Sequence, residues 1–138
     1  MEINSITSRI ISAAINVHQE LGPGLLESVY QSCMEIELKR KGLEFLSEVP
    51  LPVKYRGKII TDQGFRLDFL VEDTVIVELK SVENVQPVHK KQLLTYLRLA
   101  KKPLGLLINF NVPILKDGIS RIINSHEVFS RRAAEITE

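Results

Sequence analysis

The amino-acid sequence predicts an α/β (α+β) domain in which helices flank a mixed sheet of about four strands. Three observations predict this fold class. Apolar residues recur at helical spacing in two N-terminal segments, they alternate with polar residues in the central segments, and they form a nearly continuous run at residues 104–110. The predicted order is helix, helix, three strands, helix and strand, a layered arrangement in which the elements bury their apolar faces against one another.

Length and composition predict one globular domain. The chain has 138 residues, of which 44% are hydrophobic and 25% charged, close to the average for globular proteins. We expect a single domain over residues 1–125 and a polar C-terminal tail over residues 126–138. The 18 basic and 17 acidic residues argue against a protein that coats nucleic acid, but they leave room for a local basic patch.

The sequence also bears on the compartment. Cys33 is the only cysteine, so one chain can form neither a disulfide nor a thiolate cluster, and an unpaired thiol suits a reducing compartment. Residues 1–9 lack the basic start and long apolar run of a signal peptide. Since no segment approaches the roughly 20 apolar residues that span a bilayer, we expect a cytoplasmic protein without a membrane partner.

Two helices are expected at the start of the chain. The first covers residues 3–21 and ends at the glycine and proline residues of segment 22–24. The second covers residues 25–41 and ends with three basic residues before Gly42, a pattern typical of a helix C-terminus. The apolar arc of the second helix is expected to contain Val29, Tyr30, Cys33, Ile36 and Leu38.

The central segments read as strands. Residues 51–55 contain a proline and follow another, which indicates an edge strand or an irregular one. Residues 65–71 and 75–80 alternate between apolar and polar side chains, and the short link between them predicts an antiparallel hairpin.

The last part of the chain predicts a crossover. A third helix with Pro87 in its first turn ends near residues 101–103 and leads to the apolar run at residues 104–110. A buried strand that follows a helix is expected to pair in parallel. Residues 119–123 can add a further short strand or a turn.

The sharpest chemical pattern is Asp68, followed after nine residues by Glu78 and, two positions later, Lys80. Side chains two residues apart on a strand share a face, so Glu78 and Lys80 project together, and Asp68 can converge on Glu78 if the hairpin pairs as expected. Two carboxylates suit Mg²⁺ or Mn²⁺, and a nearby lysine can orient water and offset charge at a phosphoryl group. The alternative is cross-strand ion pairing on a solvated face.

Two helical residues can join this site. Glu27 lies at the margin of the apolar arc of the second helix, where its carboxylate is expected to be half-buried and to need a partner; the alternative is that it stabilises the helix start. Gln92 lies in a stripe with Val88, Tyr96 and Leu99, where its amide either needs a hydrogen-bond partner or faces solvent at the edge of the stripe.

A known family is similar to this sequence. Residues 24–30, Gly-Leu-Leu-Glu-Ser-Val-Tyr, match the signature G-x-x-E-x-x-Y, and the chain resembles the GxxExxY proteins of the PD-(D/E)XK nuclease superfamily. Segments 66–71, 77–80 and 92–97 follow in the order of that superfamily, and the resemblance runs from about Ile10 to Asn124. It implies a restriction-endonuclease-like core of a helix, three antiparallel strands, a helix and a parallel strand.

The resemblance also implies a function. It indicates a metal-dependent nuclease that hydrolyses phosphodiester bonds with Mg²⁺ or Mn²⁺ as cofactor. The implied partner is nucleic acid, with DNA expected before RNA. The implied metal ligands are Asp68, Glu78 and Glu27, and the implied catalytic residues are Glu27, Asp68, Glu78, Lys80 and Gln92. Leu67 replaces the proline of the superfamily name, which is commonly absent. The rival interpretations are a catalytically idle module that binds nucleic acid or protein, and a different enzyme that uses the same carboxylates.

Five further residues are candidate contacts to nucleic acid: His18, Arg66, Lys90, Lys91 and Arg98. The alternative for the histidine is a hydrogen bond at a helix end, and the alternative for the lysines is a solvated helix face. Tyr30 can hydrogen-bond near the site or fill the core. A homodimer that frames a duplex is also possible, although no surface in the sequence establishes it.

Overall fold

A five-stranded sheet forms the centre of residues 1–128, the part of the chain that the computed structural model describes. In the sheet, β3 and β4 pair in parallel and the other neighbouring strands pair antiparallel. The strands lie in chain order as β1 (Phe45–Tyr55), β2 (Lys58–Val71), β3 (Val75–Lys80), β4 (Leu104–Asn109) and β5 (Ile119–Ile123). Residues 129–138 of the predicted tail lie outside the described residues.

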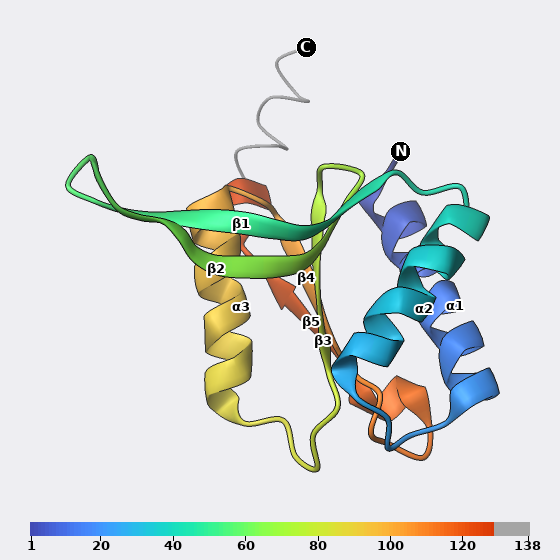
Figure 1. The fold of residues 1–138 in the computed structure, drawn as a ribbon. Helices are drawn as coiled ribbons and strands as arrows, with labels where there is room; N and C mark the ends of the chain where they lie inside the picture. Colours follow the sequence, from blue (N-terminus) through green and yellow to red (C-terminus); the bar gives the residue numbers. More distant parts are fainter. Residues whose placement is uncertain (129–138) are drawn as a thin grey trace.

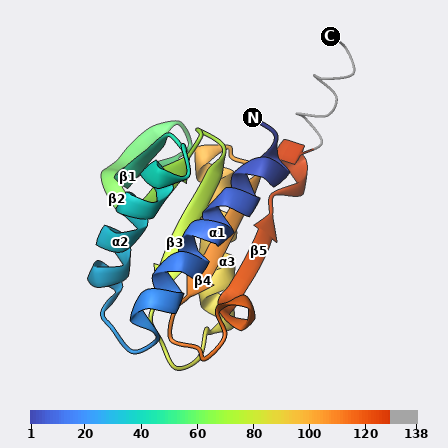
Figure 2. The ribbon, with the colours of Figure 1, turned by 90° about the vertical axis from the view of Figure 1, so that its right-hand side faces the viewer.

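Helices cover both faces of this sheet (Figures 1 and 2). α1 (Ile3–Leu21) and α2 (Glu27–Arg40) pack on one face, and α3 (Pro87–Ala100) packs on the other. A short 3₁₀ helix, η1 (Leu115–Gly118), precedes β5. The predicted fold class is therefore confirmed, with five strands in place of about four because residues 119–123 pair with β4.

The hairpin turns follow from local backbone chemistry. Arg56 and Gly57, between β1 and β2, have φ values of 51° and 79°, and Glu72 and Asp73, between β2 and β3, have 51° and 50°. Two successive residues with positive φ form the tight turn that matches the twist of antiparallel strands. β1 lies at the edge of the sheet, as its prolines predicted, and begins at residue 45 rather than 51.

The sheet separates two apolar cores. The larger lies under α1 and α2 and includes the ring of Tyr30, which stacks on Phe110 at 4.3 Å between centroids. The smaller lies under α3 and contains Leu51, Leu67, Ile76, Leu93, Tyr96, Leu97 and Leu107. The aliphatic character of both cores follows from the scarcity of aromatic residues, which make up 6% of the sequence.

The predicted apolar arc of α2 is wrong at two positions. Val29 and Ile36 are 39% and 61% exposed, whereas Tyr30, Met34 and Leu38 are fully buried. Residues four apart lie one above the other on a helix, so the stripe 30, 34 and 38 faces the sheet and leaves the other two on the flank.

β2 leaves β3 at Asp68. The two strands pair over residues 69–71 and 75–77, whereas β2 continues along β1 as far as Lys58. The alternation predicted for residues 65–71 breaks at the same point, because Leu67 packs in the core under α3 and Phe69 in the core under α1 and α2. On β1, Glu48 has φ 51°, and the register with β2 shifts further along, between Leu51 and Val53 and between Val53 and Lys54.

Gly105 allows α3 to pack closely on β4, and a substitution tests this contact. A Cβ at position 105 would lie 2.9 Å from two side-chain carbons of Leu93, which is fully buried. We expect Gly105→Ala to lower the free energy of unfolding by about 1–3 kcal/mol, measured by urea denaturation. The same substitution in a Leu93→Ala background should cost less, because the clashing carbons are gone. Equal costs in both backgrounds would contradict this contact.

Candidate active site

Asp68 and Glu78 face each other where β2 leaves β3. Glu78 Oε1 accepts a hydrogen bond from the backbone nitrogen of Asp68 at 3.1 Å. In return, Asp68 Oδ2 accepts one from the backbone nitrogen of Leu79 at 2.7 Å. Buried backbone N–H groups need acceptors once a partner strand departs. Each carboxylate therefore replaces a missing ladder bond on the opposite strand, and these bonds hold the two acids together.

Burial makes two charges at this position unfavourable. Glu78 is 9% exposed. The pKa of its carboxyl group rises from 4.5 to about 8, first through burial and then through the charge of Asp68. Burial also raises the pKa of Asp68, against the opposing effect of the Leu79 hydrogen bond. The positive charge of Lys80 lowers both pKa values. The pair therefore tends to retain a proton at neutral pH when no further cation is near.

α2 reaches the acid pair from one side. Gln31 Nε2 donates a hydrogen bond to the backbone oxygen of Asp68 at 3.0 Å, and Ser81 Oγ donates one to the backbone oxygen of Leu25 at 2.6 Å. These bonds fix the start of α2 beside β2 and the end of β3. Glu27, the first residue of α2, lies one turn before Gln31 on the same helix face. It is exposed, so the predicted half-buried position is wrong, because α2 faces the sheet through Tyr30, Met34 and Leu38.

Tyr30 anchors the loop that precedes Glu27. Its hydroxyl donates a hydrogen bond to the backbone oxygen of Gly22 at 2.6 Å and accepts one from the backbone nitrogen of Leu25 at 3.2 Å. Gly24 has φ 95°, a conformation that favours glycine. The spacing of the G-x-x-E-x-x-Y pattern thus has a structural reason. The glycine permits the turn, the tyrosine holds it from within the core, and the glutamate starts the helix.

α3 approaches the acid pair through Tyr96. This residue is 7% exposed, and its pKa rises to about 12, first through burial and then through the negative charges of Glu78 and Asp68. Its hydroxyl therefore remains a hydrogen-bond donor at neutral pH. The centre of the Tyr96 ring lies 5.1 Å from the centre of the Phe65 ring. Gln92 is half-buried one turn earlier, on the same face of α3.

The chain after Lys80 is held by a buried amide. Asn109 is the register partner of Lys80 in the parallel pair and is 3% exposed. Its side chain accepts a hydrogen bond from the backbone nitrogen of Val82 at 3.1 Å and donates one to the backbone oxygen of the same residue at 2.9 Å. These bonds fix the path of the backbone that carries the lysine, whose side chain is partly exposed.

The sequence did not single out Gln31, Ser81 or Asn109. A signal existed for Asn109, since it interrupts an apolar run and a buried amide needs partners. Gln31 follows Glu27 by one helical turn, but its hydrogen-bond partner is the backbone oxygen of Asp68 on β2, which no pattern within the helix reveals. The same holds for Ser81, which bonds a loop more than fifty residues earlier in the chain.

The five candidate contacts to nucleic acid divide into two groups. His18 is 8% exposed, and its Nε2 lies 2.7 Å from the backbone oxygen of Val112, so the structure has it in the hydrogen-bonded alternative. The four basic candidates are all exposed: Arg66, Lys90, Lys91 and Arg98. Lys91 and Arg98 lie seven residues apart, which places them on one face of α3, away from the buried Leu93 and Leu97.

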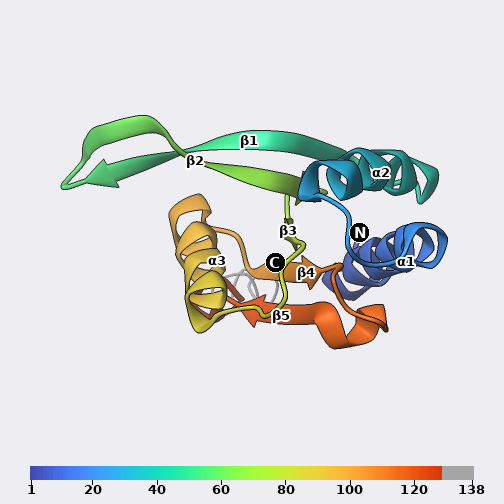
Figure 3. The ribbon, with the colours of Figure 1, turned by 60° about the horizontal axis from the view of Figure 1, so that its bottom comes forward.

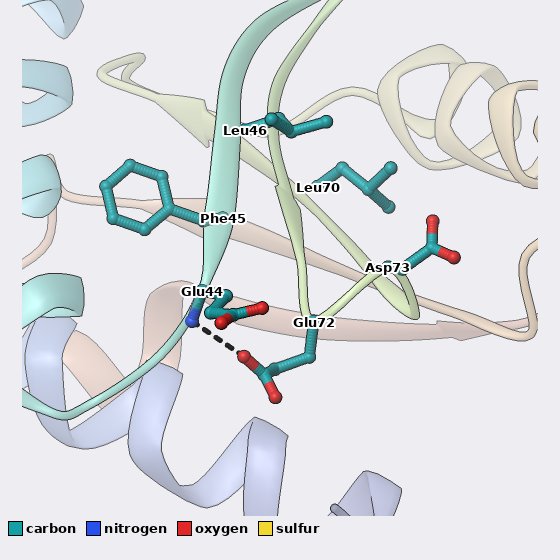
Figure 4. A pocket seen from close by; sticks show the side chains of 6 residues that line it. All are labelled: Glu44, Phe45, Leu46, Leu70, Glu72 and Asp73. Atoms are coloured by element: carbon teal, nitrogen blue, oxygen red, sulfur yellow. Dashed lines mark hydrogen bonds between the residues drawn. The ribbon is translucent and has the colours of Figure 1, made fainter.

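A surface hollow lies at the other end of the β2–β3 pairing, beside the turn that joins the two strands (Figure 4). The backbone nitrogen of Glu44 donates a hydrogen bond to Glu72 Oε2 there, at 2.6 Å. Three of the residues that line the hollow are acidic and three are apolar: Glu44, Glu72, Asp73, Phe45, Leu46 and Leu70. Lys102 Nζ lies 2.9 Å from Asp73 Oδ1 and offsets its charge, so Glu44 and Glu72 are the acids that disfavour phosphate groups at this end of β2.

The acid pair has the chemistry of a divalent-cation site. Carboxylate oxygens are hard ligands of the kind that Mg²⁺ and Mn²⁺ prefer, and a cation would relieve the repulsion between the two buried acids. Asp68 and Glu78 therefore fit such an ion. Within residues 1–128, no group of three or more His, Cys, Asp or Glu side chains is arranged to hold a metal.

A mixed sheet that presents two acids and a lysine on diverging strands, between helices, defines a restriction-endonuclease-like protein. Residues 4–122 match the family model of the PD-(D/E)XK nuclease superfamily, and the chain belongs to that superfamily. No curated protein and no solved structure matches it significantly. Among the described residues, none of the helices has the length and apolar character needed to cross a membrane.

The raised pKa of Glu78 predicts a pH-dependent stability. Folded Glu78 keeps its proton up to about pH 8, whereas the unfolded chain releases it above 4.5. The folded state thus binds more protons in this window, and the free energy of unfolding should fall as the pH rises from 4.5 to about 8. Urea denaturation at several pH values, without divalent ions, measures this free energy. The fall should be smaller in Glu78→Gln and unchanged in the exposed control Glu20→Gln. An identical slope in Glu78→Gln would contradict the buried pair.

Proposed function

We propose that this chain is a metal-dependent nuclease of the GxxExxY type, which hydrolyses phosphodiester bonds in nucleic acid within the cytoplasm. The observation that supports this function most is the pair Asp68 and Glu78, held by reciprocal backbone hydrogen bonds beside Lys80. Burying two acids against each other is unfavourable, and such perturbed groups cluster at functional sites. Membership of the PD-(D/E)XK superfamily supports the same conclusion.

The carboxylates of Asp68 and Glu78 would hold a Mg²⁺ or Mn²⁺ ion. When bound, this ion would supply positive charge to a phosphoryl oxygen and make a water molecule more acidic. We assign Glu27 as the further carboxylate, supplied from the start of α2. Its link to the pair runs through Gln31, which lies on the same helix face and bonds the backbone of Asp68.

Lys80 follows Glu78 by two positions on β3 and places an ammonium group beside the pair, as its effect on both acid pKa values indicates. Its role is to orient the attacking water and to offset the negative charge that grows on the phosphoryl group in the transition state. From α3, the amide of Gln92 and the protonated hydroxyl of Tyr96 offer hydrogen bonds to the substrate backbone. The exposed Arg66, Lys91 and Arg98 are proposed phosphate contacts, together with Lys90.

One observation favours a second function, a regulatory module that binds nucleic acid or protein without cleaving it. One oxygen of Asp68 and one of Glu78 already accept backbone hydrogen bonds. If these bonds keep the acids from binding an ion, the fold remains but the chemistry is lost. Cleavage and metal binding separate the two functions.

Cleavage is tested with labelled DNA and RNA, single-stranded and duplex, with and without Mn²⁺. We expect cleavage that requires the ion and falls about 100-fold or more in both variants, because Asp68→Asn removes a charged ligand of the ion and Lys80→Ala removes the positive charge that offsets the transition state. Lys39→Ala, which changes an exposed lysine at the far end of α2, is the matched control. Circular dichroism checks that the variants fold. Activity that persists in Lys80→Ala would point to a contaminant and sink the assignment.

Metal binding is measured by calorimetry with Mn²⁺ alone. Because Glu78 holds a proton at neutral pH, binding should release it, and the heat measured should vary with the ionisation enthalpy of the buffer. The affinity should increase as the pH rises towards 8. Glu78→Gln should lose the proton release, whereas Glu20→Gln should behave as the wild type. No binding, even with nucleic acid present, would favour the regulatory module.

A further inference from the structure

β1 and β2 extend beyond the body of the protein as a two-stranded ribbon that projects past α3 (Figures 1 and 3). We define the arm as residues 53–62. Residues 54–60 are all exposed, whereas Leu51 and Leu67, which flank the arm on the two strands, are 6% and 2% exposed. The body of the domain therefore leaves the side chains along the outer part of the arm largely uncovered.

The arm combines positive charge with large apolar side chains. It carries three basic residues, Lys54, Arg56 and Lys58, against one acid, Asp62, in a chain with a net charge of +1. The guanidinium of Arg56 lies 5.7 Å from the centre of the Tyr55 ring. Three large apolar side chains of the arm are more than half exposed: Tyr55 at 64%, Ile59 at 60% and Ile60 at 64%. Basic residues interleaved with apolar ones suit a polyanion that also offers apolar surface, which is the chemistry of nucleic acid.

The register distributes these side chains over both faces of the arm. Tyr55 pairs with Lys58, and Lys54 pairs with Ile59. Residues directly opposite each other on antiparallel strands share a face, and successive pairs alternate. Each face therefore presents one lysine and one large apolar side chain. An element enclosed between two phosphate backbones needs positive charge on both sides, and the arm provides it.

The arm continues the strand that carries Asp68. Register shifts after Leu51 and Val53 add extra residues to β2, so the pair Tyr55 and Lys58 lies only six β1 residues beyond the pair Val49 and Leu67, which is about 20 Å of strand. One turn of B-form DNA is about 34 Å long. A duplex with its scissile phosphate at the acid pair can therefore follow β2 past the exposed Arg66 and meet the arm within one turn. The opposite end of β2 meets the acidic hollow of Figure 4, which repels such a path.

We propose that the arm binds in the groove of double-stranded DNA and makes duplex DNA the substrate class of this protein. The proposal rests on the nuclease function above. The major groove of B-form DNA admits a two-stranded ribbon, whereas that of A-form RNA is too deep and narrow. Gly64 lies at the base of the arm, where a Cβ would meet the methyl groups of Val53 on β1 and Thr61 on β2 at 2.8 Å, so the glycine gives room for the irregular register of β2 at this point.

The test compares the wild type with the triple variant Lys54→Gln, Arg56→Gln and Lys58→Gln. Binding to a DNA duplex of about 30 base pairs, nearly three turns, is measured by fluorescence anisotropy at several salt concentrations. The slope of log Kd against log salt should fall by about 0.9 for each phosphate that the variant no longer neutralises, or roughly 2 to 3 in total. Binding to an RNA duplex of the same sequence should change little. Lys39→Gln, Arg40→Gln and Lys41→Gln, at the end of α2, is the control with the same loss of charge.

Three outcomes would overturn the arm proposal. The first is an unchanged salt slope in the triple variant, and the second is a wild type that binds no DNA duplex. The third is a triple variant that changes its oligomeric state in size-exclusion chromatography but keeps its DNA affinity, which would assign the arm to a second copy of the chain. Arm-dependent duplex binding without any metal-dependent cleavage would instead support the arm and reject the nuclease function.

Discussion

The mutual burial of two carboxyl groups at a point of strand divergence is the constraint on which the rest of this structure depends. When β2 departs from β3, backbone N–H groups lose their ladder partners, and Asp68 and Glu78 accept the hydrogen bonds in exchange. The arrangement satisfies the backbone but places two acids in a region of low exposure, where both pKa values rise. Such a site is unfavourable for two charges and is stabilised by a cation.

The surrounding elements hold this pair from three directions. α2 contributes Gln31 to the backbone of Asp68, the buried Tyr96 of α3 lies where the charges of both acids raise its pKa, and the buried amide of Asn109 fixes the chain that follows Lys80. Close packing around such contacts matters because a catalytic group must be held within a fraction of an ångström of its productive position. Beyond the pair, β2 stays paired with β1 alone and passes over α3 towards the arm (Figure 1).

The sequence predicted the fold well where local periodicity and chain connectivity coincide. The first helix was predicted over residues 3–21 and occurs there, β3 covers the predicted residues 75–80, and the strand after α3 pairs in parallel as the crossover rule requires. The prediction was wrong for Val29 and Ile36, which are exposed because α2 uses the stripe of Tyr30, Met34 and Leu38. The apolar residues of α2 cover a wider arc of the helix than the part that contacts the sheet, so the sequence of the helix does not specify which of them face the sheet.

The sequence by itself determined which chemical groups this protein has and which strands carry them, because spacing along a strand sets the face of each side chain. The alternation predicted around Asp68 failed, since Leu67 packs in the core under α3 and Phe69 in the core under α1 and α2, and both cores are built from segments that are distant along the chain. The reciprocal hydrogen bonds, the positions of Gln31 and Ser81, and the exposure of the arm were decided by the tertiary structure. Burial and long-range hydrogen bonds depend on which segments meet in space, and periodicity within one segment does not contain that information.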